Sequence, residues 1–393
     1  MKYKLNDLLD FKTQGVNTTT DNVSYVNSGY KIVQAKNIEP YNITFDDTNF
    51  IDSDTFDRIK ENHKLHKGEV LYTNIGSQLG NSAIYDYDDE AIITWNVMKL
   101  IPKKEIIDNN YLCYLLNNNK MTIKALNTSS TMPFVSGKEL MNVEFEVPEL
   151  DIQKKVVKIL KKIEDKIKLN NIIANNLDEF ANNYFDKIYR ETSNEYYYLE
   201  NYVTFSQGKQ VGVDNQSLTK ESNMKRFLRI IDFTNPSEPI RYVEDFGDRY
   251  YAKLDDIIMI RYGSQTCGKV VRGKEGIIAN NMFKINMKDY ELNNYIYYYL
   301  KSKKIQSQLT SSQNSSTMPS INFGIMNKLE IKIPPKDIII QFNKIIEPIR
   351  LLLIELANEN EKMNNLRDTL LPKLINGEIN LDKIDIWLYK FYL

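Results

Sequence analysis

Two histidines, His63 and His66, are the residues whose type and spacing most directly suggest chemistry. Three residues apart on a helix, they could bind one metal ion between them. A zinc site normally needs further Cys or His ligands, whereas the two cysteines, Cys113 and Cys267, lie far from each other in the sequence and form no CxxC pair. We therefore expect a surface pair of histidines, two structural thiols and no metal site.

Two glycine-rich segments could hold a phosphate group, GSQLGNS at 76–82 and GSQTCGK at 263–269. Neither ends in the Lys-Ser or Lys-Thr pair of a nucleotide triphosphate loop, and the sequence has no GxGxxG fingerprint and no GxSxG elbow. The segment NPSEP at 235–239 begins like the Asn-Pro-Pro-aromatic motif of amino-methyltransferases but departs from it after two residues. Carboxylates are plentiful, yet one sequence assigns none of them to acid–base or nuclease chemistry. The sequence favours a binding protein over an enzyme.

The composition is that of a globular protein, with 42% hydrophobic and 11% aromatic residues among 393, enough for two or three domains. The first residues, MKYKLNDLLDFKTQG, lack the apolar core and cleavage site of a secretory signal, and no apolar run is long enough to span a membrane. We predict a cytoplasmic protein without a membrane partner. A formal net charge of −1 argues against bulk coating of nucleic acid, although a neutral total can conceal a basic face.

The pentapeptide SSTMP occurs twice, at 129–133 and at 315–319, and it is the last of a collinear series of matches between the two halves of the chain. A preserved order of matches with small changes of offset is the mark of an internal duplication with loop insertions. The paired segments are KLNDLLDF with YLENYVTF, IVQAKNI with FLRIIDF, KGEVLYTNIGSQLG with LDDIIMIRYGSQTCG, IITWNVMKL with IIANNMFKI, and NNYLCYLL with NNYIYYYL.

Within each half the pattern predicts several short strands and a few helices, an α/β or α+β domain. Runs such as GEVLYTNI and DIIMIRY are rich in β-branched and aromatic residues and end at glycine turns, as strands do. NNYLCYLLNNNKM and its twin predict an amphipathic helix opened by an Asn cap. Each half then reaches an extended segment, VEFEVPEL or LEIKIPPK, in which proline stops strand pairing.

After the prolines, each half continues into a long helical pattern with one apolar stripe. A segment of about 37 residues forms a helix roughly 55 Å long, and a lone helix with such a stripe needs a partner. The economical partner is the other helix, packed antiparallel, which returns the C-terminus toward the first domain. Asn170 and Glu359 interrupt the stripes and either fix the register or are ordinary local breaks. Pro348 should kink the second helix or mark its first turn. The stripes are Val156, Ile159, Ile163, Ile167, Ile173, Leu177, Phe180, Tyr184 and Ile188, and Ile345, Ile349, Leu352, Leu356, Met363, Leu366 and Leu370.

These features together resemble the DNA specificity subunit of Type I restriction-modification systems, over essentially the whole chain. The resemblance rests on the two similar halves, the proline-led long helices, PELDIQKKV at 148–156, PPKDIIIQ at 334–341 and LRDTLLPKLINGEI at 366–379. KGEVLYTNIGSQLG is also similar to the family's Gly-Asp-apolar signature, and so is LDDIIMIRYGSQTCG, in which Leu254 and Asp255 replace the usual Gly-Asp start. Gln341 lies two positions later relative to its proline than Gln153 does, which puts the start of the second helix in doubt.

The resemblance implies two target recognition domains, at 1–150 and 198–336, each reading one half of a split site in double-stranded DNA. The first spacer helix, in 151–197, and the second, in 337–393 together with a C-terminal tail, would form a coiled-coil spacer between domains related by a pseudo-two-fold axis. It also implies that this chain is not an enzyme and holds no cofactor. Two methyltransferase subunits that use S-adenosylmethionine to methylate adenine would be its partners, either alone or together with a restriction subunit that uses ATP and magnesium.

Residues that read bases should be polar and lie on loops or strand ends, with Arg suited to guanine and Asn or Gln to adenine. Corresponding positions that differ between the halves are of most interest, because two domains that read different half-sites must differ there: Gln34 with Arg229, Asn74 with Arg261, and Trp95 with Asn280. Shared polar residues could contact phosphates or scaffold the loops instead, and any of these residues could be a satisfied turn group. The full set of candidates is Gln34, Lys36, Asn37, Asn74, Gln78, Trp95, Asn96, Ser129, Ser130, Thr131, Arg229, Arg261, Gln265, Lys269, Asn280, Asn281, Ser315, Ser316 and Thr317. Because SSTMP is identical in both halves, its variable neighbours, beginning with Phe134 and Ser320, are better places to look for what distinguishes the half-sites.

Two other classes of function stay open at this point. A duplicated-domain scaffold on a coiled-coil rod would bind protein and show no DNA sequence preference. A nuclease or methyltransferase in its own right would turn over substrate without partners, and the missing motifs argue against it.

Overall fold

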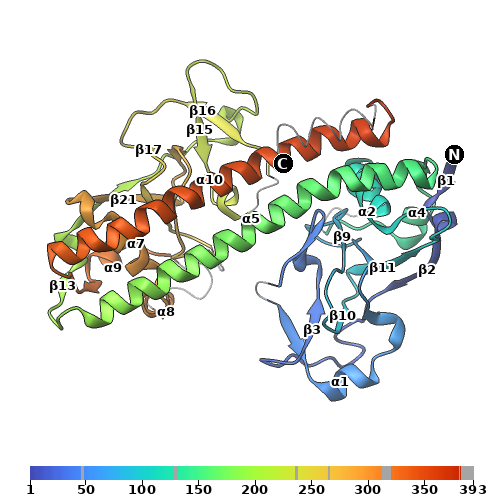
Figure 1. Ribbon diagram of the computed structural model, residues 1–393, viewed down its shortest axis with the longest axis horizontal. Helices are drawn as coiled ribbons and strands as arrows, with labels where there is room; N and C mark the ends of the chain where they lie inside the picture. Colours follow the sequence, from blue (N-terminus) through green and yellow to red (C-terminus); the bar gives the residue numbers. More distant parts are fainter. Residues whose placement is uncertain are drawn as a thin grey trace. The chain divides into compact units, whose positions relative to one another are not determined.

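The computed structural model describes residues 1–45, 48–127, 132–234, 238–263, 266–311, 320–379 and 381 (Figure 1). The chain forms two compact units, one made of residues 1–164 with 365–393 and the other of residues 165–364. Two long helices, α5 (Leu150–Glu191) and α10 (Lys336–Ile375), each contribute to both units.

The first unit contains two four-stranded sheets that are joined by the turn between β10 and β11. The first sheet has the order β2-β11-β8-β9 and is antiparallel, and the second has the order β6-β3-β10-β7 with a parallel pair, β3 and β10. The strands are β1 (Lys2–Lys4), β2 (Leu9–Gln14), β3 (Tyr30–Val33), β4 (Ile38–Glu39), β5 (Asn42–Ile43), β6 (Asn49–Ile51), β7 (Lys64–Leu65), β8 (Val70–Thr73), β9 (Ser82–Ile84), β10 (Ala91–Ile93), β11 (Val97–Pro102) and β12 (Glu144–Glu146). The short helices are α1 (Ser53–Arg58), α2 (Asn109–Asn118), α3 (Lys120–Lys124) and α4 (Gly137–Met141).

The second unit repeats this topology. Its sheets have the orders β14-β21-β18-β19 and β16-β15-β20-β17, again with one parallel pair, β15 and β20, and β13 pairs with β22 as β1 pairs with β12. Equal strand orders confirm the internal duplication. The strands are β13 (Tyr197–Tyr198), β14 (Val203–Gln207), β15 (Met224–Leu228), β16 (Arg241–Glu244), β17 (Tyr251–Ala252), β18 (Ile257–Ile260), β19 (Val270–Val271), β20 (Gly276–Ile278), β21 (Met282–Met287) and β22 (Glu330–Ile331), and the short helices are α6 (Ile231–Thr234), α7 (Asn293–Lys301), α8 (Lys303–Ser311) and α9 (Phe323–Asn327).

The expected Asn cap of α2 was wrong by one residue. The side chain of Asp108 caps this helix by accepting hydrogen bonds from the backbone N–H groups of Asn110 at 2.8 Å and Tyr111 at 3.2 Å. Aspartate is as good an N-cap as asparagine because its carboxylate accepts the same two orphan donors and also favours the positive end of the helix dipole.

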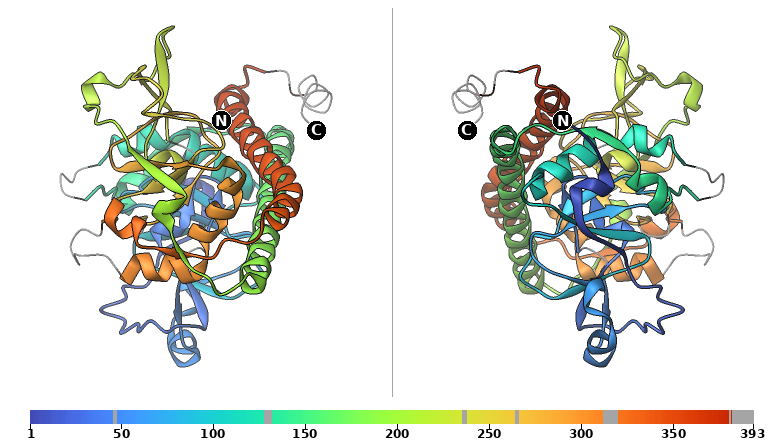
Figure 2. Two further views of the ribbon diagram at one scale, coloured as in Figure 1. Left: turned by 90° about the vertical axis from the view of Figure 1, so that its left-hand side faces the viewer. Right: turned by 90° about the vertical axis from the view of Figure 1, so that its right-hand side faces the viewer.

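Helices α5 and α10 pack antiparallel, as the sequence predicted (Figures 1 and 2). Asn170 of α5 donates to the side chains of Glu359 at 2.7 Å and Asn360 at 2.9 Å, whereas Phe185 of α5 lies against Phe342 of α10. Partner numbers on α10 fall as those on α5 rise, which only an antiparallel pair produces. The interruptions Asn170 and Glu359 therefore meet each other, and Asn170, 1% exposed, is a satisfied buried polar group at the seam.

Part of the predicted apolar stripe was wrong. Ile173, Phe180, Ile345 and Leu352 are 36%, 52%, 39% and 39% exposed. The buried face of α5 here includes Asn170 and Ala181, which an apolar pattern does not count, and the core of the second unit combines both helices with α7. Which face of α5 is buried therefore depends on α10, α7 and the sheet together, and the sequence of α5 alone does not specify these contacts.

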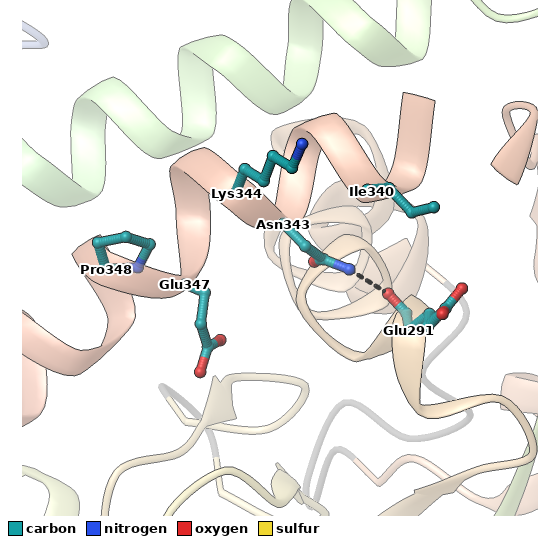
Figure 3. A pocket seen from close by; sticks show the side chains of 6 residues that line it. All are labelled: Glu291, Ile340, Asn343, Lys344, Glu347 and Pro348. Atoms are coloured by element: carbon teal, nitrogen blue, oxygen red, sulfur yellow. Dashed lines mark hydrogen bonds between the residues drawn. The ribbon is translucent and has the colours of Figure 1, made fainter. Parts of the chain in front are cut away.

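Helix α10 begins at Lys336, directly after Pro334 and Pro335, so Pro348 lies inside the helix and does not mark its first turn (Figure 3). Gln341 is exposed on this helix. Asn343, and not Gln341, attaches the helix to the domain by donating to the backbone carbonyl of Glu291 at 2.7 Å. This hydrogen bond lies beside a pocket lined by Glu291, Ile340, Asn343, Lys344, Glu347 and Pro348. The shifted position of Gln341 relative to its proline thus means that another residue, Asn343, makes the contact with the domain. The helix itself begins directly after the two prolines.

Candidate nucleic-acid interface

In the first unit, three polar groups from strand ends meet at one edge of the antiparallel sheet. Gln14 is the last residue of β2, Asn74 follows β8, and Trp95 lies in the turn between β10 and β11. Gln14 Nε2 donates to Asn74 Oδ1 at 2.9 Å and to the backbone carbonyl of Trp95, and Asn74 Nδ2 donates to Gln14 Oε1 at 3.4 Å. Asn74 is 1% exposed and Trp95 is 42% exposed. The two amides satisfy each other, and the indole of Trp95 is left facing solvent.

The second unit builds the same arrangement with different chemistry. Gln207 ends β14 and donates to the backbone carbonyl of Asn280, as Gln14 does to that of Trp95. Its Oε1 accepts from Nη1 of Arg261 at 2.9 Å, and the guanidinium of Arg261 lies 5.0 Å from the ring centroid of Tyr262. Nε of Arg261 and Oδ1 of Asn281 are buried without a hydrogen-bond partner. A guanidinium therefore occupies the place of a paired amide.

Sequence reasoning singled out Asn74, Arg261, Trp95 and Asn280 but missed the two glutamines that hold them. The available signal was the repeated Gln-Gly at 14–15 and 207–208. A Cβ on Gly15 would lie 2.3 Å from the carbonyl oxygen of Ile93, and one on Gly208 would lie 2.1 Å from that of Ala279. Glycine is required because the strand end passes directly over the neighbouring turn, which brings the preceding glutamine into contact with it.

The segments that follow the two SSTMP motifs return to this edge. The N–H of Val135 donates to the carbonyl of Asn74 at 3.1 Å, and the N–H of Ile321 donates to the carbonyl of Arg261 at 3.0 Å. Phe134 and Ser320 form the equivalent isolated bridges, to Ile75 and Tyr262. The variable neighbours of SSTMP thus lie beside the variable strand ends. The candidates Ser129, Ser130, Thr131, Gln265, Ser315, Ser316 and Thr317 lie outside the described residues.

Gln34 and Arg229 follow β3 and β15 and differ as expected, but protein groups engage both. Gln34 donates to Tyr25 at 3.2 Å and accepts from Asn49 at 2.9 Å. Arg229 pairs with Asp232 at 3.0 Å and with Glu238 at 3.4 Å, and it also donates to the carbonyl of Pro239. An arginine already neutralised by two carboxylates is a weak candidate for a base contact.

The other candidates divide by burial and partners. Asn37 is fully buried and donates to the carbonyl of Thr44 at 3.0 Å, so its position indicates a structural role. Gln78 accepts from Asn81 at 2.9 Å, and Asn96 accepts from Thr94. The exposed candidates are Lys36, Trp95, Lys269 and Asn280. Exposed lysines beside strand ends suit phosphate contacts better than base contacts.

Comparison with known proteins identifies the family. Residues 1–179 and 212–362 match the model of the Type I restriction modification DNA specificity domain. The chain belongs to this family. It is 23% identical over 312 residues to the Type I restriction enzyme MjaIX specificity subunit of Methanocaldococcus jannaschii, covering 72% of each chain. It is 22% identical over 401 residues to the HindI specificity subunit of Haemophilus influenzae, covering 80% of this chain and 87% of that one.

The fold agrees with this assignment. The crystal structure of a Type I restriction-modification S subunit from M. genitalium matches with a TM-score of 0.53 at 14% identity, over 95% of both chains. The protein is thus a DNA specificity subunit of a Type I restriction-modification system, a class of subunit that is not itself catalytic.

The two histidines of the specificity subunit flank β7 in the first unit. His66 pairs with Glu61 at 3.3 Å, and burial lowers the pKa of His63. Burial raises the pKa of the thiol of Cys113. Within the described ranges no cluster of His, Cys, Asp and Glu could hold a metal ion, and no described helix is long and apolar enough to cross a membrane.

Lys120 gives the specificity subunit a pH dependence that can be measured. Its ammonium donates to Asn81 beneath the 76–82 turn, and burial, with a smaller effect of Lys124, lowers its pKa from 10.5 to about 8. Between about pH 8 and 10.5 the folded protein holds Lys120 neutral while the unfolded chain protonates it, so the free energy of unfolding should rise with pH in this window. Below pH 8 both states are charged and the cost of burying the ammonium is constant.

The measurement is the difference in free energy of unfolding between wild type and Lys120→Met at a series of pH values. We expect the free energy of unfolding of the wild type to rise relative to that of the variant by about 1 kcal/mol as the pH rises from 7 to 9.5. Lys154→Met, at an exposed position on α5, is the control and should stay parallel to the wild type. Parallel curves for wild type and Lys120→Met would exclude a depressed pKa.

Proposed function

We propose that each half of the specificity subunit reads one half of a split site in double-stranded DNA, with residues 1–150 and 198–336 as the target recognition domains. The observation that carries this proposal is the pair of equivalent strand-end edges, which share a glutamine and a Gln-Gly turn but present different side chains. A duplicated scaffold would keep both edges alike, whereas two readers of different half-sites need the same frame with different contacts.

The long helices serve as the spacer in this proposal, with 151–197 and 337–393 as its two segments. The hydrogen bonds from Asn170 to Glu359 and Asn360 support a fixed register within the helix pair. A fixed register would hold the separation of the two half-sites constant, so that the base pairs between them need not be read.

Catalysis belongs to partners in this proposal. Two methyltransferase subunits that bind S-adenosylmethionine would methylate adenine at the site, and a restriction subunit that uses ATP and magnesium would cleave DNA, all in the cytoplasm. Exposed apolar residues of the helices, namely Leu169, Ile172, Phe180 and Leu351, offer a surface for such subunits. Their side chains are between 49% and 54% exposed, so a partner subunit could bury them.

The test is an exchange of recognition domains followed by sequencing of the host methylome. Replacing residues 1–150 by the corresponding domain of another specificity subunit should change one half of the methylated motif and leave the other half and the spacing intact. Deleting the gene should abolish adenine methylation at that motif. An unchanged methylome after deletion would contradict the proposal and favour a protein-binding scaffold without DNA specificity.

A further inference from the structure

We propose that Arg261 reads a guanine in the major groove of the half-site bound by the second domain, and that Gln207 is the positioning residue that aims it. This inference rests on the proposed function, since it assigns one base contact within a half-site. It concerns one side chain whose donors the surrounding protein leaves partly unused.

The guanidinium of Arg261 is held in place but is not neutralised by the described residues. Nη1 donates to Gln207, and the planar group lies against the ring of Tyr262. Its Nε is buried without a partner, and among the ion pairs of the described residues Arg261 takes part in none. By contrast, Arg229 and Arg350 each pair with a carboxylate. A half-buried cation without a counter-charge is costly, and a ligand that supplies acceptors removes this cost.

The free donors match a guanine edge. Arginine presents its N–H groups in a flat fork, and guanine offers the two acceptors O6 and N7 side by side in the major groove. Because Gln207 takes one hydrogen of Nη1, the second hydrogen of Nη1 and those of Nη2 remain for a bidentate contact. A phosphate could accept the same donors, so the two sources must be separated by experiment.

The first domain argues for a base over a phosphate. The equivalent position there is Asn74, which is 1% exposed and paired with Gln14. Phosphate contacts set the register of a domain on DNA and would be needed equally by both halves, whereas base contacts must differ. The second domain presents the guanidinium of Arg261, whereas the first domain pairs the amides of Asn74 and Gln14 with each other. Such a difference at equivalent positions is expected of residues that recognise bases. The half-site of the first domain should lack this guanine contact.

The test measures binding of the full chain, assembled with its methyltransferase, to defined duplexes. Selection from a randomised double-stranded library first gives the preferred site of the wild type. Each guanine of the half-site assigned to residues 198–336 is then replaced singly by 7-deazaguanine, which lacks N7, or by inosine, which keeps both O6 and N7. We expect one 7-deazaguanine to weaken binding roughly 10- to 100-fold, with inosine tolerated at that position.

Arg261→Ala should weaken binding to the native duplex by a similar factor and should lose no further affinity on the 7-deazaguanine duplex. Equal losses on every duplex, with a salt dependence reduced by about one phosphate contact, would assign Arg261 to the DNA backbone and overturn the inference. A half-site without guanine would also overturn it. Failure of the proposed function has a different signature, because the wild type would then select no sequence at all.

Two further variants separate positioning from folding. Gln207→Ala should reduce the preference for guanine over 7-deazaguanine, whereas a merely structural role would weaken binding to both duplexes by the same factor. Arg249→Ala removes an exposed arginine that also lies near a tyrosine ring, at 5.5 Å from the centroid of Tyr250, but that has no amide clamp. This control should leave the guanine preference unchanged. Loss of the preference in Arg249→Ala would show that base discrimination needs an arginine without the glutamine clamp, and it would overturn the assignment to Arg261.

Discussion

Replacing Gln153 by alanine should lower the free energy of unfolding by about 3 kcal/mol. This side chain is fully buried where α5 begins. Its Oε1 accepts from the N–H of Asp108 at 2.9 Å, and its Nε2 donates to the carbonyls of Ile106 and Pro148, both at 2.8 Å. One amide therefore ties the start of the long helix to the start of α2 and to the extended segment before the helix. Its removal leaves three partly buried backbone groups without this partner, at a cost of about 1 to 3 kcal/mol for each group that water cannot reach.

Urea denaturation of the full chain measures the effect, and hydrogen exchange of residues 105–112 locates it. Gln153→Met keeps the volume but not the hydrogen bonds, so it should recover the packing part of the loss and no more. Lys154→Ala, one residue further on and exposed, should change stability by less than about 0.5 kcal/mol. If Gln153→Met were as stable as the wild type, packing and not hydrogen bonding would hold the helix to the domain.

The duplication and the two helices could be predicted because both depend on local or repeated patterns. SSTMP and the other matched segments compare the chain with itself, and an apolar period compares each helix with its own geometry. Even the meeting of Asn170 and Glu359 follows from two interrupted stripes placed antiparallel. The exposed side chains of Ile173 and Phe180 could not be predicted, since the face of α5 that is buried depends on α7 and on the sheet as well as on α10.

In the candidate site too, contacts between residues close in sequence could be predicted, whereas contacts between residues far apart in sequence could not. Arg229 has Asp232 three residues later, so its neutralisation could have been inferred from the sequence RIID. Arg261 has no carboxylate within four residues in the sequence, and its clamp comes from Gln207, 54 residues earlier. The pairing of Gln14 with Asn74 likewise spans 60 residues. Such contacts arise only when the strands are assembled, and for this reason the glutamines were missed while their variable partners were found.

Replacing Gly208 by alanine should disrupt recognition of one half-site while leaving the other intact. The added Cβ would lie 2.1 Å from the carbonyl oxygen of Ala279 and 2.7 Å from that of Ile278. Both contacts are with backbone, so no side-chain rotation relieves them, and the turn that carries Asn280 and Asn281 must move. We expect the free energy of unfolding to fall by about 3 kcal/mol. We also expect methylation to fall more at sites that depart from the consensus only in the half-site assigned to the second domain than at sites that depart only in the other half.

The matched control is Gly212→Ala, four residues along the same loop. Gly212 has an ordinary backbone φ of −64°, and the nearest atom to an added Cβ is 4.0 Å away, so this variant should behave as the wild type. Gly15→Ala makes the equivalent collision in the first domain and should affect the opposite half of the motif. The methylome of each variant measures the outcome. Equal effects of Gly15→Ala and Gly208→Ala on both halves would mean that these turns support the fold as a whole. Opposite effects would assign each strand-end edge to its own half-site, because each glycine acts on the turn of its own domain.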